Sequence, residues 1–170
     1  MDGFVAVTDP GWYEYLSREP GPKDANFWRP SARAFQLKIG TPFFFKLKAP
    51  HHAIGGFGYF AGFSILPDWL AWDTFGTANG VNGLAQLRAQ HSRIQEGARI
   101  QGDPRGSIGC CLIAEARFFQ RDAWVGTHTV DGSFYSAGNV CNSFGGTQFA
   151  FAFPAGLVLG VPVRDNLMSP

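Results

Sequence analysis

The segment from residue 43 to residue 65 restricts the fold of this chain more than any other part of its sequence. It opens on three phenylalanines followed by Lys-Leu-Lys, so that Phe45 and Leu47 alternate with Lys46 and Lys48. An apolar–polar alternation with a period of two predicts a β-strand that has one buried face. This run is the clearest strand signal in the chain.

A turn over residues 49–52 separates that strand from a second predicted strand over 54–65. Four glycines interrupt the second strand, and glycine inside a strand indicates a bulge or the close approach of another backbone or a ligand. The other expected elements are a strand over 4–7, a short helix after an Asp9-Pro10 N-cap, a strand edge over 35–38, helices over 68–75 and 83–99, and strands over 108–114 and from 117 onward. This order does not repeat βαβ units, so it predicts an α+β fold with a mixed or partly closed sheet.

The composition fits a compact domain. Hydrophobic residues make up 45% and charged residues 16% of the 170 residues, a balance that excludes a disordered protein. No apolar run is long enough to predict a membrane span, and the N-terminus lacks the features of a secretory signal. Cys110, Cys111 and Cys141 have neither ligand nor disulfide spacing and are expected to be buried free thiols of a cytoplasmic protein.

Positive charge is concentrated between Arg18 and Lys48. Seven basic and two acidic residues give this stretch a net charge of +5, whereas the whole chain carries +1. A local excess of charge matters more to a polyanionic partner than the total does. Within the stretch, residues 26–31 read Asn-Phe-Trp-Arg-Pro-Ser and are expected to form a loop.

This loop and the strand after it form the predicted nucleic-acid-binding site. A reader of a flipped base needs aromatic walls for stacking, polar groups for the base edge and cations for the phosphates. Phe27 and Trp28 are the expected walls and are expected to face outward. The polar members are Asn26 and Ser31 for the base edge, and Arg29, Lys46, Lys48 and His51 for the phosphates. The alternative is that the two rings pack in the core and hold a loop in place.

Trp69 and Trp72 lie three apart on a predicted helix and form a candidate second pocket wall, with ordinary helix packing as the alternative. The pair His51-His52 has no carboxylate at ligand spacing, and adjacent residues point in different directions. No nucleophile–base motif and no phosphate-binding glycine motif is present. The sequence therefore predicts no metal site, no cofactor and no catalytic residue.

Five segments occur in an order that gives the chain its resemblance to a known family: FVAVTDPGWYEYL, NFWRPS, FFFKLKAPHHAIGGFGYFAGFS, LAWDTFGTANGV and IGCCLIAEARFF. With them, residues 4–125 resemble the N-terminal domain of bacterial HNH-type restriction endonucleases. The resemblance implies a PUA-like fold related to the EVE, YTH and SRA readers, which is a mixed, partly closed β-barrel flanked by short helices. It also implies a module that reads double-stranded DNA, often by a base modification such as a modified cytosine, while a separate C-terminal HNH domain cuts.

The resemblance ends near residue 125, where the composition changes. From residue 126 to residue 163 the only charged residue is Asp131, and no His-rich ββα-metal signature follows Trp124. Residues 1–125 are therefore expected to form the PUA-like domain. Residues 126–170 are expected to be an atypical uncharged tail, made either of extra strands or of a truncated or frameshifted end.

The function that the sequence predicts is a DNA-binding specificity module of a modification-dependent HNH-type restriction endonuclease, which reads a flipped modified base. Two alternatives stay open at this point. One is a truncated or structural fragment of such a nuclease with no retained activity, and the other is an RNA-binding PUA-like domain.

Overall fold

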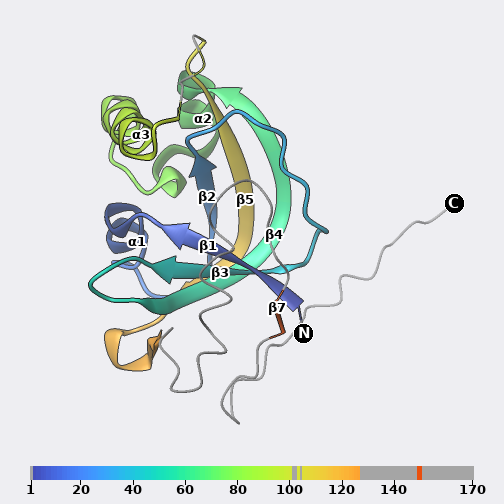
Figure 1. The fold of residues 1–170 in the computed structure, drawn as a ribbon, viewed down its shortest axis with the longest axis vertical. Helices are drawn as coiled ribbons and strands as arrows, with labels where there is room; N and C mark the ends of the chain where they lie inside the picture. Colours follow the sequence, from blue (N-terminus) through green and yellow to red (C-terminus); the bar gives the residue numbers. More distant parts are fainter. Residues whose placement is uncertain (1, 101–102, 104, 127–148, 151–170) are drawn as a thin grey trace, which may run out of the picture.

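The computed structural model describes residues 2–100, 103, 105–126 and 149–150 (Figure 1). Its strands are β1 (Asp2–Thr8), β2 (Lys23–Arg29), β3 (Pro42–Leu47), β4 (Ala53–Pro67), β5 (Ser107–Phe118), β6 (Val125–Gly126) and β7 (Phe149–Ala150). Its helices are α1 (Pro10–Leu16), α2 (Asp68–Phe75) and α3 (Leu84–Ala98), with 3-10 turns η1 (Gly76–Asn79) and η2 (Arg121–Ala123). In this described part, each helix is too short or too polar to cross a membrane.

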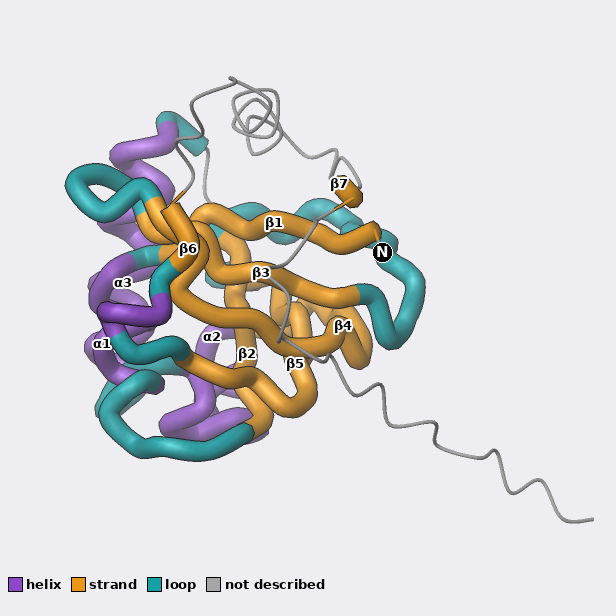
Figure 2. Tube along the Cα trace, turned by 90° about the horizontal axis from the view of Figure 1, so that it is seen from below, coloured by secondary structure: helices purple, strands orange, loops and turns teal. Residues whose placement is uncertain are grey.

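A single sheet joins the described strands in the order β2-β5-β4-β3-β1-β7, and β6 pairs with β4 beside this path. β1 runs parallel to β3, whereas the other pairs are antiparallel. β4 and β5 curve strongly, and the helices gather on one side of the strands (Figure 1, Figure 2). The outer strands of this order do not pair with each other, so the described sheet is not closed. The predicted α+β class with a mixed, incompletely closed sheet is confirmed.

The alternation predicted for the 43–48 segment is confirmed in β3. Phe43, Phe45 and Leu47 belong to the main core cluster, whereas Phe44 belongs to a smaller cluster with Val5. Neighbouring residues of a strand point to opposite faces of the sheet. Lys46 therefore lies on the face of Phe44, and the main core lies on the other face.

Glycines allow β4 to lie close to β5. A Cβ at Gly56 would clash with the backbone carbonyl oxygen of Arg117, and a Cβ at Gly58 would clash with the side chain of Ile113. The pairing of β4 with β5 also shifts register at two places along the strands. Both the close backbone approach and the bulges predicted from the glycine content are confirmed.

The predicted N-cap of the first helix is also confirmed. The Asp9 Oδ1 atom accepts hydrogen bonds from the backbone N–H groups of Gly11 and Trp12 at 2.9 and 3.2 Å. The helix that starts there buries Trp12, whose Nε1 donates to the backbone carbonyl oxygen of Asn26 at 3.1 Å. This bond fixes α1 against β2. The helices predicted over 68–75 and 83–99 are α2 and α3.

Three predicted elements are wrong. Residues 26–29 of the predicted 26–31 loop belong to β2, residues 35–38 lie in the connection between β2 and β3 instead of forming a strand edge, and residues 107–118 form one strand instead of two. β5 accounts for the first and the third, because it pairs with β2 on one side and with β4 on the other, whereas residues 35–38 belong to none of the described strands. Pairing between segments that are distant in the sequence overrides local propensity. Local propensity carries no information about such pairing.

Candidate nucleic-acid interface

Trp28 is buried and Phe27 is half-buried against the core, so the expectation that both rings face outward is wrong. Trp28 is 6% exposed, and Phe27 packs against the main core. The Trp28 Nε1 atom donates to the backbone carbonyl oxygen of Asn79 at 3.0 Å, and the Phe27 ring lies 5.1 Å from the Phe43 ring. The physical reason is that burying a large aromatic ring in the core is more favourable in free energy than leaving it exposed to water.

Asn26 is fully buried in a polar network that joins β2 to the α2–η1 segment. Its Nδ2 atom donates to Asn79 Oδ1 at 2.9 Å. Asn79 Nδ2 in turn donates to the carbonyl oxygens of Ala71 and Gly76 at 3.1 and 2.9 Å. Buried polar groups are stable only when they have such partners. In this structure Asn26 therefore supports the fold, and it does not reach the surface.

Ser31 and Arg29 mark the start of the connection between β2 and β3. Ser31 is 7% exposed, and its Oγ accepts a hydrogen bond from the backbone N–H of Arg33 at 3.2 Å. The half-buried Arg29 guanidinium lies over the Phe35 ring, 4.7 Å from its centroid. Burial lowers the pKa of Arg29, but a guanidinium keeps its charge in proteins. The fold thus places one predicted cation against an aromatic ring.

The fold does not bring the side chains of Lys46, Lys48 and His51 together with the rings of Phe27 and Trp28. Lys46 lies on the sheet face opposite to the main core, and Lys48 is exposed just after β3. His51 lies in the turn between β3 and β4, where its ring meets the Trp124 ring edge-on at 5.0 Å. The alternation of β3 separates these side chains from Trp28. Their contact with phosphates stays a prediction.

The two tryptophans of α2 differ in their surroundings. Trp69 is 51% exposed, whereas Trp72 packs against the main core. Packing, the alternative given for them above, accounts for Trp72. Packing against the main core does not explain the position of Trp69.

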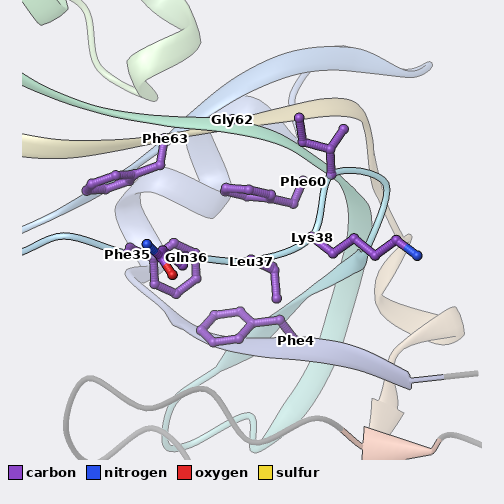
Figure 3. Close-up of a pocket in the computed structure, with 9 residues that line it drawn as sticks. Phe4, Phe35, Gln36, Leu37, Lys38, Phe60, Gly62 and Phe63 are labelled. Carbon is purple, nitrogen blue, oxygen red and sulfur yellow. The ribbon is translucent and has the colours of Figure 1, made fainter.

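An open pocket lies beside the connection between β2 and β3. Its volume is about 670 Å³, within the usual size range of small-molecule sites. Figure 3 shows Phe60 and Phe63 on β4, Phe4 on β1, and residues 35–38 running between these strands. The lining residues are Phe4, Phe35, Gln36, Leu37, Lys38, Ile39, Phe60, Gly62 and Phe63. We refer to this site as the aromatic pocket.

Phe35 is the central ring of the aromatic pocket. It meets Phe4, Phe60 and Phe63 edge-on, at ring-centroid distances of 5.2, 5.7 and 5.9 Å. Edge-to-face contacts are a favoured arrangement of aromatic rings. The Arg29 guanidinium covers the same ring, as described above. The pocket therefore combines π-faces with a nearby positive charge, which is the chemistry that stacks a flat, electron-rich group.

The polar groups of the aromatic pocket come from Gln36 and Lys38, both of which are exposed. An amide supplies two donors and an acceptor, and an ammonium supplies three donors. No carboxylate is among the residues that line the pocket. The site can thus accept a neutral ring or an anion without electrostatic repulsion.

Sequence reasoning missed the aromatic pocket although it reached the neighbouring segments. The sequence predicts a strand edge at Phe35, and for the 54–65 segment it predicts bulges or the close approach of a backbone or a ligand without naming its rings as a site. The available signal was the pair Phe60 and Phe63 beside Gly62, because a glycine next to rings indicates room for a ligand. Phe4 could not be found in this way, since only the fold places β1 next to residues 35–38.

The two described cysteines are buried thiols that are not activated. Burial raises the pKa of Cys110 to about 11 and that of Cys111 to about 12, so both stay protonated thiols at neutral pH. The third cysteine, Cys141, lies outside the described residues. Across residues 2–100, 103, 105–126 and 149–150, no three His, Cys, Asp or Glu side chains are placed so that they could hold a metal ion.

His91 of α3 gives the domain a pH-dependent stability. It is 7% exposed, its ring lies 6.1 Å from the Trp28 ring, and burial lowers its pKa below the usual 6.5. The unfolded chain therefore takes up a proton at a higher pH than the folded chain does. The contribution of His91 to stability is therefore expected to be complete above pH 6.5 and to fall as the pH drops below that value.

We expect the change His91→Gln to flatten this dependence. As the pH falls from 6.5 toward the lowered pKa of folded His91, the unmodified protein should lose up to about 1.4 kcal/mol per pH unit through this group, and the variant should lose none of that amount. Urea denaturation at a series of pH values measures the effect. Equal slopes for the two proteins would show that His91 is protonated equally in both states.

Comparison with known proteins gives a fold and no family. No protein-family model matches the chain, and no curated protein matches it. The crystal structure of ASCH from Zymomonas mobilis is similar, with a TM-score of 0.56 and 12% identity over 86% of each chain. A crystal structure of a mutant of the same protein has a TM-score of 0.54 and 12% identity over 88% of this chain and 91% of that one. The chain therefore has the PUA-like α+β fold of these ASCH structures.

Proposed function

We propose that this domain binds nucleic acid and holds one extruded nucleobase in the aromatic pocket. The observation that carries the proposal is the cluster of four phenylalanine rings with the Arg29 guanidinium stacked on one of them. The PUA-like fold supports it, because base readers are built on that fold. In the finer form of the proposal, the domain is the DNA-reading module of a modification-dependent HNH-type restriction endonuclease.

The energies of extrusion and stacking are of similar size. Taking a base out of a duplex costs a few kcal/mol, and stacking on aromatic rings returns roughly 1–3 kcal/mol per base. Contacts to the base edge from Gln36 and Lys38 then decide whether the extruded state is populated. A modified base that pairs weakly or adds apolar surface for the rings shifts this balance toward the protein.

The predicted phosphate contacts extend the proposal beyond the pocket. Lys38 lies at the pocket, whereas Lys46, Lys48 and His51 lie around the β3–β4 turn. Contacts of this type position a nucleic acid without reading its sequence. They also make affinity depend on salt, since each neutralised phosphate releases counterions.

Gel shifts with three matched duplexes test the proposal directly. The duplexes carry cytosine, 5-methylcytosine or 5-hydroxymethylcytosine at one position, and a single-stranded RNA serves as competitor. We expect binding at low salt, with the strongest shift for a modified duplex. Absence of binding to all duplexes and to RNA at low salt would refute the proposal, and preference for RNA would replace DNA by RNA as the partner.

Lys46 provides a separate test of the phosphate contacts. We expect Lys46→Gln to weaken the three duplexes equally and to lower the slope of log K against log salt by about 0.9. Arg105→Gln removes the same charge from an exposed loop position and should leave the slope unchanged. A loss restricted to one duplex would assign Lys46 to base recognition instead.

A further inference from the structure

Ile39 is the most exposed large apolar side chain among the described residues. Its exposure is 71%, compared with 51% for Trp69 and 44% for Ile65. A single exposed apolar side chain is common on protein surfaces and by itself indicates nothing. Its position within the fold is what gives Ile39 a meaning.

The turn that carries Ile39 is fixed to β4 by backbone hydrogen bonds. The Gly40 N–H donates to the Phe60 carbonyl oxygen at 2.7 Å, and the Phe60 N–H donates to the Thr41 carbonyl oxygen at 2.9 Å. Within the turn, the Thr41 N–H donates to the Lys38 carbonyl oxygen at 3.1 Å. Gly40 has a φ of +84°, a left-handed conformation that favours glycine. The backbone that carries the apolar side chain is thus held in place before any partner binds.

This fixed turn also borders the aromatic pocket. Lys38 and Ile39 both line it, and Phe60, which anchors the turn, is one of its rings. An exposed cation, an exposed apolar side chain and a ring pocket therefore lie on neighbouring residues. Insertion of an apolar side chain between base steps is a known means of opening and bending a duplex.

We infer that Ile39 is a wedge that enters a DNA duplex and fills the space left by the base in the aromatic pocket, while Lys38 contacts the adjacent phosphate. This inference rests on the proposed function of the same pocket. The partner is double-stranded DNA with one extruded base. A single strand leaves no gap in a stack, so the wedge contributes to duplex binding and contributes nothing to single-strand binding.

The test compares Ile39→Ser with the control Ile65→Ser, which removes an exposed isoleucine from β4 outside the pocket. The probes are a duplex and the corresponding single strand, each with 2-aminopurine next to the modified base. Fluorescence of 2-aminopurine rises when the neighbouring base leaves the stack. We expect Ile39→Ser to bind the duplex about tenfold more weakly and to abolish the rise, while the single strand, which meets Ile39 only as part of the pocket lining, should lose a clearly smaller part of its affinity. Ile65→Ser should match the unmodified protein in all three measurements.

The alternative results of this test distinguish failure of the wedge from failure of the proposed function. If Ile39→Ser keeps full duplex affinity and the full fluorescence rise, the wedge is refuted and the proposed function stands. If duplex and single strand are weakened equally, Ile39 acts only as part of the pocket lining and the wedge is again refuted. If the unmodified protein binds neither probe, the wedge and the DNA-reading form of the proposed function both fail.

Discussion

Gly62→Leu is expected to weaken the binding of a modified duplex by about a hundredfold, because it fills the aromatic pocket from within. Gly62 lines the pocket, and nothing lies within 4 Å of the place where its Cβ would stand. Its φ lies outside the left-handed range, so leucine fits the backbone without strain. The added side chain takes the space that a base would occupy. Fluorescence anisotropy with a labelled duplex measures the loss.

The matched control for this variant is Gly97→Leu. Gly97 is exposed on α3, and the site of its Cβ is likewise free of neighbours within 4 Å. It adds the same volume outside the pocket and should leave affinity unchanged. Both variants should unfold at nearly the same temperature as the unmodified protein. Full affinity of a folded Gly62→Leu variant would exclude the aromatic pocket as the base site.

Asn79→Ala is expected to lower the free energy of unfolding by about 3 kcal/mol. Asn79 is fully buried, and its side chain joins Asn26 of β2 to the carbonyl oxygens of Ala71 and Gly76. Alanine leaves these three groups without that partner in the interior. A buried donor or acceptor that loses its partner costs about 1–3 kcal/mol, more than a typical bond contributes.

Asn82→Ala is the control for this prediction, because Asn82 lies three residues further along and is exposed. Its effect should stay within about 0.5 kcal/mol. Urea denaturation followed by tryptophan fluorescence measures both, and Trp28, which bonds to Asn79, is one of the reporters. Equal midpoints for the two variants would mean that water replaces the Asn79 side chain and that the network contributes little.

The local sequence predicted the elements whose signals lie within a few residues. The Asp9-Pro10 cap, the alternation of β3 and the glycines of β4 each act over short distances, and the structure has the corresponding helix start, strand and close approach. It also gave the order of elements and therefore the α+β class. The loop predicted over residues 26–31 is a strand up to residue 29 because these residues pair with β5, far away in the chain, and the strand edge predicted at 35–38 is absent because none of the described strands pairs with these residues.

The candidate site shows the same division. The sequence pointed to residues 26–31 because rings, amides and a cation occur there together. The structure buries Asn26 and Trp28, and it keeps only Arg29 from that motif near the aromatic pocket. Composition marks which residues are able to stack or to bond. It does not say which of them face water, because burial depends on the element that packs on top.

What the sequence alone determined is therefore the α+β class, the caps and turns, and the excess of positive charge before residue 48. Only the tertiary structure decided that Phe4, Phe35, Phe60 and Phe63 form one pocket. These rings come from β1, from the β2–β3 connection and from β4, and they meet because β3 pairs with β1 on one side and with β4 on the other. Sheet pairing over long sequence distances assembles the site, and no local pattern encodes it.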